Sequence, residues 1–173
     1  MVEVASSTVK KDMSNTFTDT SRHAKTIAMW FLQRNKREQK DNFDVEGISN
    51  LKLQKLLYYA YGCYLASTKK RLFSEHLEAW QHGPVVPEIY DIYKHYGAGS
   101  INSDSDSDSD SKVELENEIT DVLEWVYNEF GQFTAWALRN RTHEERPWLE
   151  TEQSQTISDD LIYEYFVDKY VEV

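Results

Sequence analysis

The chain has few of the residues on which several protein classes depend. Its 173 residues include one cysteine, three prolines and six glycines. A single cysteine excludes an intramolecular disulfide and the paired-cysteine spacing of zinc sites, and no glycine-rich phosphate loop is present. Because Cys63 lies in an apolar stretch, we expect a buried thiol, which fits a reducing cytosol.

The sequence also lacks a long hydrophobic run. Its longest uncharged apolar stretch is about half of the roughly 20 residues that a membrane-spanning helix needs. The first twenty residues contain no apolar run of signal-peptide length. We therefore expect a cytoplasmic protein that has no membrane partner.

Positive charge is in deficit, with 19 Lys and Arg against 30 Asp and Glu and a net charge of −11. Nucleic-acid affinity comes largely from basic side chains that neutralise phosphates, so nucleic acid is not expected as a partner. A transcriptional regulator is disfavoured as well, because no basic helix follows a turn of the helix-turn-helix type. Residues 101–121 hold a net −7 of the charge, so the rest of the chain is only mildly acidic.

Hydrophobic content of 40% in 173 residues is sufficient for one domain. Residues 1–20 are polar and aperiodic and are predicted to form a flexible N-terminal tail, followed by a domain over 21–173. The alternating Ser and Asp residues of 103–111 predict a disordered acidic loop at 101–113. This repeat lacks the glycine and the terminal glutamate of an EF-hand, so calcium binding is not expected.

Periodicity predicts a mainly α fold, in which a single compact domain of about six helices carries a small β-hairpin. Helices are expected at 22–37, at 50–68, from Pro87, from 115 to 130, around 133–137 and after Ser158. The second of them is apolar on nearly all sides, so we expect it at the centre of the domain.

Local signals mark the ends of these elements. Helix caps are predicted at Ser21, at Ser49 or Asn50, and at Ser158. Residues 71–73 and 77–80 are predicted to be two short strands or extended arms. Thr142 and Glu145 have the spacing of a capping box, in a turn that Pro147 keeps short.

Few residues are candidates for catalysis. The apolar surroundings of Cys63 suppress the thiolate that a nucleophile requires. His82 and His143 are the better candidates for a polar role. For both, a hydrogen bond to the backbone that holds a turn is favoured over a role as metal ligand or catalytic base. We predict no enzyme, cofactor or metal site. The alternative left open is a small cytosolic hydrolase that uses His82 or His143 with a carboxylate.

The chain is rich in aromatic residues, with 11 Tyr and 5 Trp. Tyr and Trp are the side chains most often found as interface anchors. Three of them are expected in the core: Tyr64, Trp136 and Trp148. Four others are candidates for contact with a partner: Tyr58, Tyr61, Trp80 and Tyr90.

Three segments together carry a resemblance to a known family. They are Lys52-Leu53-Gln54-Lys55-Leu56-Leu57-Tyr58-Tyr59-Ala60, then Glu78-Ala79-Trp80 with His82-Gly83-Pro84-Val85-Val86-Pro87-Glu88-Ile89-Tyr90, and Thr142-His143-Glu144-Glu145 with Pro147-Trp148. Over residues 22–170 the chain resembles the Panacea domain of the SocA/GepA-like, phage-associated antitoxin family. The tail and the Ser-Asp repeat depart from the family's simpler pattern.

The resemblance implies a non-enzymatic antitoxin that neutralises a cognate toxin, usually encoded beside it, by direct binding. For SocA-like members it also implies delivery of the toxin to a cytosolic AAA+ protease. We expect the toxin-binding or signature surface to include residues of all three segments: Lys52, Gln54, Lys55, Tyr58, Tyr61, Trp80, His82, Pro84, Val85, Pro87, Tyr90, His143 and Trp148.

Overall fold

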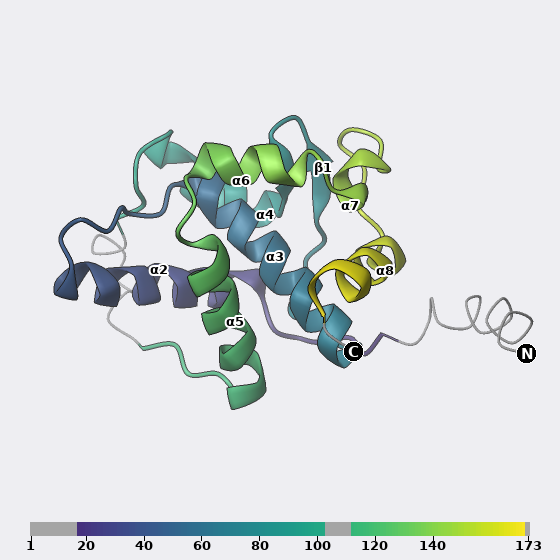
Figure 1. The fold of residues 1–173 in the computed structure, drawn as a ribbon, viewed down its shortest axis with the longest axis horizontal. Helices are drawn as coiled ribbons and strands as arrows, with labels where there is room; N and C mark the ends of the chain where they lie inside the picture. Colours follow the sequence, from purple (N-terminus) through teal and green to yellow (C-terminus); the bar gives the residue numbers. More distant parts are fainter. Residues whose placement is uncertain (1–16, 103–111, 172–173) are drawn as a thin grey trace, which may run out of the picture.

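A computed structural model describes residues 17–102 and 112–171. Residues 1–16 of the expected tail and residues 103–111 of the expected acidic loop lie outside the described residues. The described chain is mainly helical and carries one small antiparallel hairpin, which confirms the predicted fold class (Figure 1).

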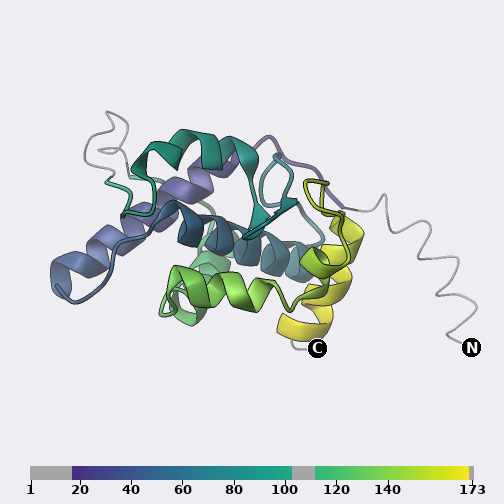
Figure 2. The same ribbon diagram turned by 90° about the horizontal axis from the view of Figure 1, so that it is seen from above.

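Helix α3, Asn50–Thr68, is the centre of the domain, as its apolar circumference predicts. All of residues 52–66 are buried, and α3 contacts helices α2, α4, α5, α6 and α8 as well as strand β2. Seen from above, α4 lies on one side of α3 and α6 on the other (Figure 2). The hydroxyl of Ser49 accepts a hydrogen bond from the Lys52 amide, which confirms the predicted cap.

Helix α2, Ala24–Asp41, begins later and ends later than the sequence predicts. Ser21 does not cap it, so that prediction is wrong. The residue at the cap position is His23, whose side chain makes no capping bond. Instead, the carboxylate of Glu75 accepts a hydrogen bond of 2.8 Å from the Ala24 amide. An acidic residue far along the chain thus provides the hydrogen-bond acceptor at the start of α2, and its negative charge lies at the positive end of the helix dipole.

The remaining helices of the second half of the chain follow the predicted order, except that a short helix, α7 (Arg146–Leu149), stands where a turn is predicted. The others are α5 (Asn117–Phe130), α6 (Ala135–Thr142) and α8 (Asp159–Tyr170). The Ser158 hydroxyl accepts from the Leu161 amide and caps α8 as predicted. Helix α8 packs closely on α3, because Gly62 leaves room there for the ring of Phe166.

The hairpin pairs different residues from those predicted. Strand β1 is Glu78–Trp80 and strand β2 is Gly83–Val85, followed by α4 (Pro87–Tyr93) and the short 3-10 helix η1 (Lys94–Tyr96). Residues 71–73 are neither helix nor strand, and their Leu72 and Phe73 side chains are fully buried. Of the two forms predicted for this segment, the strand is therefore not observed. Pro87 does begin α4, as predicted.

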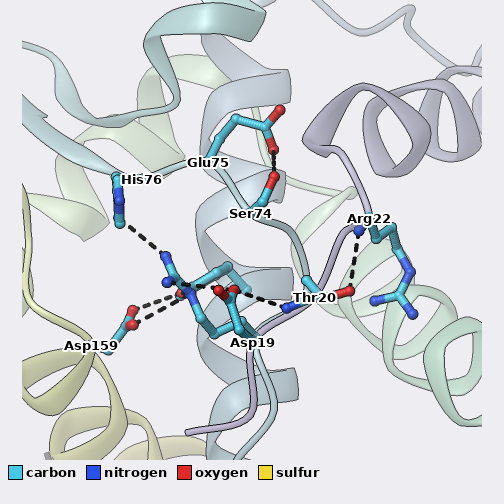
Figure 3. Close-up of polar contacts among 9 residues, drawn as sticks. Asp19, Thr20, Arg22, Ser74, Glu75, His76 and Asp159 are labelled. Atoms are coloured by element: carbon cyan, nitrogen blue, oxygen red, sulfur yellow. Dashed lines mark hydrogen bonds and ion pairs between the residues drawn. The ribbon is translucent and has the colours of Figure 1, made fainter. Parts of the chain in front are cut away.

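Residues 17–20, which the sequence assigns to the tail, lie against the domain. Phe17 packs on Tyr163, and the amide of Thr18 donates to the Lys69 carbonyl. The guanidinium of Arg71 joins this segment to α8, since it lies 3.7 Å from Asp19 and 3.5 Å from Asp159. Figure 3 shows Asp19 and Asp159 converging on this point together with His76.

Candidate functional site

Two polar side chains of α3 hold the backbone of the hairpin. The Lys55 ammonium nitrogen donates to the Pro84 carbonyl at 2.8 Å, and the side-chain oxygen of Gln54 accepts from the Val86 amide at 2.9 Å. Both bonds are buried, where an unpaired backbone group would cost about 1 to 3 kcal/mol. The helix segment and the Gly-Pro-Val-Val-Pro segment are therefore one structural unit.

Other polar residues of α3 extend this scaffold. The Asn50 amide donates to the Tyr90 carbonyl, and Gln54 donates to the Asn50 oxygen. The Lys52 ammonium donates to the Gly131 carbonyl at 2.6 Å, and burial lowers the pKa of Lys52. The first turns of α3 thus fix α4 and the end of α5.

Lys55 has no exposed surface and pairs with no carboxylate in the described part of the chain. Burial, with a smaller contribution from Arg139, lowers its pKa to about 7. The neighbouring residue Gly83 has a φ of +108°, and a Cβ there would lie 2.7 Å from the Thr142 hydroxyl and 2.8 Å from Lys55 Cε. Only glycine fits between α3 and α6 at this position.

The segment after α6 is tied down by a buried carboxylate. Glu145 is 3% exposed and accepts hydrogen bonds from the hydroxyls of Tyr58, at 3.0 Å, and Tyr170. Burial raises the pKa of Glu145, while these phenol bonds oppose the rise. The predicted capping box is wrong, because the Thr142 hydroxyl donates to the Arg139 carbonyl instead.

These contacts place much of the expected surface in the interior. Tyr61 is 2% exposed and donates to Asp159 at 2.6 Å, whereas Tyr58 is fully buried. Neither tyrosine is therefore available to a partner. The other residues of the expected surface that are buried are Lys52, Gln54, Lys55, Pro84 and Val85. Pro87 is partly buried at the start of α4.

The structure brings the rest of the expected surface together. The Trp148 indole donates to the Trp80 carbonyl at 2.7 Å, and Trp80 packs edge-on against Tyr90 at 5.1 Å between ring centres. The ring of His143 stacks on Trp148 at 4.0 Å between ring centres, and the Gln81 backbone raises its pKa against the effect of burial. That a histidine holds a turn through the backbone stays a prediction.

Two further residues complete this surface, and the sequence does not single them out. Trp136, expected in the core, is 55% exposed, because Leu138 supplies the buried face of α6. Arg139 lies over the Trp136 ring at 4.5 Å and donates to His82 Nδ1 at 3.4 Å. The three-residue spacing of Trp136 and Arg139, which sets them side by side on a helix, is the sequence signal for this pair.

We name these residues the hairpin surface: Trp80, His82, Tyr90, Trp136, Arg139, His143 and Trp148. Its cationic residue is Arg139, and the carboxylate of Glu78 lies at its edge, where it accepts a hydrogen bond from the Trp80 indole at 3.0 Å. Burial lowers the pKa of His143, and the charges that lower it further are those of Arg139, Lys55 and His82. The surface combines exposed and half-buried aromatic rings with the guanidinium of Arg139, on a backbone that α3 holds in place.

The described residues provide no nucleophile and base in contact. His82 and His143 pair with no carboxylate within residues 17–102 and 112–171, although the hydrolase alternative requires such a pair. Burial raises the pKa of the Cys63 thiol, which disfavours the thiolate. No group of three or more potential metal ligands is present among the same residues.

Comparison with known proteins identifies the domain. The family described as antitoxin SocA-like, Panacea domain, matches residues 53–149, which is more than half of the chain. The chain belongs to this SocA-like antitoxin family. The Panacea match runs from within α3 through the hairpin surface to the end of α7, so it includes Gln54 and Lys55 of the scaffold and the surface that they support.

The curated relative Antitoxin SocA of Caulobacter vibrioides (strain NA1000 / CB15N) is 46% identical to this Panacea protein over 50 residues. That stretch covers 29% of this chain and 27% of the relative, so the match spans about a quarter of the relative's length. No solved structure matches the chain. Within the described residues, no helix is both long enough and apolar enough to span a membrane.

Proposed function

We propose that this Panacea protein is a cytoplasmic antitoxin that neutralises a cognate toxin, encoded beside it, by direct binding at the hairpin surface. Membership of the SocA-like antitoxin family supports the antitoxin role. The observation that carries the placement is the exposure of Trp136 and Tyr90 beside the half-buried rings of Trp80 and Trp148, on a backbone held by the buried α3 scaffold.

The physical properties of the hairpin surface suit a binding role. Tyr, Trp and Arg are the residues that most often dominate binding energy at protein interfaces. The hairpin backbone is already fixed by Lys55 and Gln54, so little conformational entropy is lost when a partner binds. A rigid aromatic surface can therefore bind tightly without a large contact area.

Neutralisation can proceed by steric block or by removal of the toxin. As the resemblance to SocA-like antitoxins implies, we propose that the complex also delivers the toxin to a AAA+ protease. In that case the toxin should disappear faster from cells that contain the antitoxin than from cells that lack it. Equal toxin half-lives in the two strains would limit this protein to steric block.

The central experiment is co-expression with the product of the adjacent reading frame. The wild-type protein should permit growth and should copurify with that product. Trp80→Ala and Tyr90→Ala should weaken both effects while unfolding stays cooperative. Trp125→Ala is the matched control, because this α5 residue is 44% exposed and lies outside the hairpin surface.

Two results would contradict the proposal. If the wild-type protein neither protects cells nor copurifies with the neighbouring product, that product is not the cognate toxin. If both hairpin variants protect as well as the wild type does, the binding site lies elsewhere on the domain.

A further inference from the structure

We propose that the toxin segment bound at the hairpin surface carries a carboxylate, which pairs with Arg139 beside the exposed ring of Trp136. This inference rests on the proposed function and adds the chemical class of the bound segment. It is drawn from the bonds of Arg139, the charges around it and the exposure of Trp136.

Arg139 has hydrogen-bonding capacity to spare. Its Nε group donates to His82 Nδ1, and its Nη1 group donates to the side-chain oxygen of Asn140 at 2.9 Å. Within the described residues, the Nη2 group has no hydrogen-bond acceptor and no carboxylate lies within ion-pair distance of Arg139. Arginine binds a carboxylate through two parallel N–H bonds, so the missing partner matches a carboxylate in shape and charge.

Three arginines of the chain have acidic partners: Arg34 pairs with Glu124 at 2.9 Å, Arg71 with Asp159 at 3.5 Å, and Arg146 with Glu150. Arg139 differs from these three, and it also lies over the ring of Trp136, which is 55% exposed. A partner that covers this ring would meet an arginine that has no carboxylate among the described residues.

The charges near Arg139 also favour an acidic segment. Lys55 lies beneath the hairpin and is the second basic group of this region. Arg139 lowers the pKa of both Lys55 and His143, so its positive charge reaches both groups. A basic toxin segment would be repelled here, whereas an acidic one would be attracted and held in register.

Trp136 provides an apolar surface beside the proposed ion pair between Arg139 and the toxin carboxylate. The Arg139 guanidinium lies 4.5 Å from the centre of the Trp136 ring, which keeps the charged group in place. When a partner covers this ring, it also excludes water from the guanidinium and strengthens the ion pair. We therefore expect the bound segment to carry an apolar residue next to its acidic one.

The test measures the affinity of the purified antitoxin for the product of the adjacent reading frame. Arg139→Glu should weaken binding by about 30-fold or more, the range for disrupting a hydrogen-bonded charge pair at an interface. Arg139→Gln should have a smaller effect in the same direction. Lys169→Glu is the control, because it makes the same charge change at an exposed position on α8.

A reversion experiment identifies the toxin residue. In cells that express Arg139→Glu, toxin variants that are neutralised again should carry Lys or Arg in place of one Asp or Glu. Circular dichroism should show that Arg139→Glu and Lys169→Glu unfold at similar temperatures. Restoration of binding by a swapped pair of charges would support direct pairing.

The outcomes separate this inference from the proposed function. If the wild-type antitoxin does not bind the neighbouring product, the proposed function fails. If the wild type binds and Arg139→Glu and Arg139→Gln bind equally well, only the acidic-segment inference fails. The inference would also be overturned if the toxin substitutions that restore neutralisation all replaced one apolar residue by another.

Discussion

Lys55 is a lysine whose side chain is completely buried and whose hydrogen bond is to a carbonyl instead of an acid. Burial lowers its pKa to about 7, against about 10.5 in the unfolded chain. Between these values the unfolded protein binds more protons than the folded one, so the contribution of Lys55 to stability rises with pH. Below pH 7 the full cost of burying its charge is present.

We predict that the wild type gains on the order of 2 kcal/mol of stability relative to Lys55→Met when the pH rises from 7 to 9. Urea unfolding of both proteins at several pH values measures this difference. The contributions of the other titrating groups to the free energy of unfolding are the same in both proteins and cancel in the comparison. Lys169→Met, which changes an exposed lysine, should show no such trend. Parallel stability curves for Lys55→Met and the wild type would contradict the lowered pKa.

Glu145 is the acidic counterpart of Lys55 in the interior. Glu145→Ala should destabilise the fold by about 3 kcal/mol, because it leaves the hydroxyls of Tyr58 and Tyr170 without their acceptor. Glu145→Gln keeps an acceptor oxygen and should cost less. Thermal unfolding measures both, with Glu144→Ala at the exposed neighbouring position as the control. Equal losses for Ala and Gln would show that the phenol bonds contribute little.

At the scale of elements, the close contact of α3 with α8 changes the expected effect of replacing a helix glycine by alanine. Alanine normally stabilises a helix by about 1 kcal/mol relative to glycine. At Gly62, however, a Cβ would lie 2.4 Å from ring carbons of Phe166. We predict that Gly62→Ala destabilises the protein by about 1 to 3 kcal/mol, the usual cost of overpacking a core.

The measurement is the midpoint of urea unfolding. Ser67→Ala, at an exposed position of the same helix, is the control and should change stability by a few tenths of a kcal/mol. If Gly62→Ala raises the midpoint, the two helices can separate without loss and the close packing is not important for stability.

Elements with local signals are predictable from this sequence, and elements that depend on distant contacts are not. Ser49 and Ser158 cap the helices that follow them, and both caps are predicted. The start of α2 depends on Glu75, far along the chain, so its predicted cap at Ser21 is wrong. Strand β2 is missed because Gly83 and Pro84 are typical turn residues, whereas in the structure Gly83–Val85 pairs with Glu78–Trp80.

The candidate site is predictable in its segments but not in its exposed residues. The three motif segments do meet in space, as the resemblance implies. Burial decides which of their side chains a partner can reach, and burial depends on the packing of all the helices. Tyr58 and Tyr61 therefore belong to the interior, whereas Trp136, expected inside, lies on the surface.

At the scale of the whole molecule, α3 contacts most of the other elements and is surrounded by them. We predict that amide hydrogens of residues 53–66 exchange only when the whole domain unfolds, since no local opening exposes this helix. Amides near Lys40, at the exposed end of α2, should exchange much faster. Native-state hydrogen exchange measures both rates. Faster exchange in α3 than in α2 would contradict the central role of α3.

The cap that Glu75 gives to α2 has a consequence for protein synthesis. Ala24 and Glu75 are separated by 51 positions, so the ribosome makes the whole of α2 and α3 before the residue that completes the start of α2. A nascent chain that stops before Glu75 lacks the acceptor of the Ala24 amide, so that amide is left to water. Helix α2 therefore receives its cap only after all of α3 has been made.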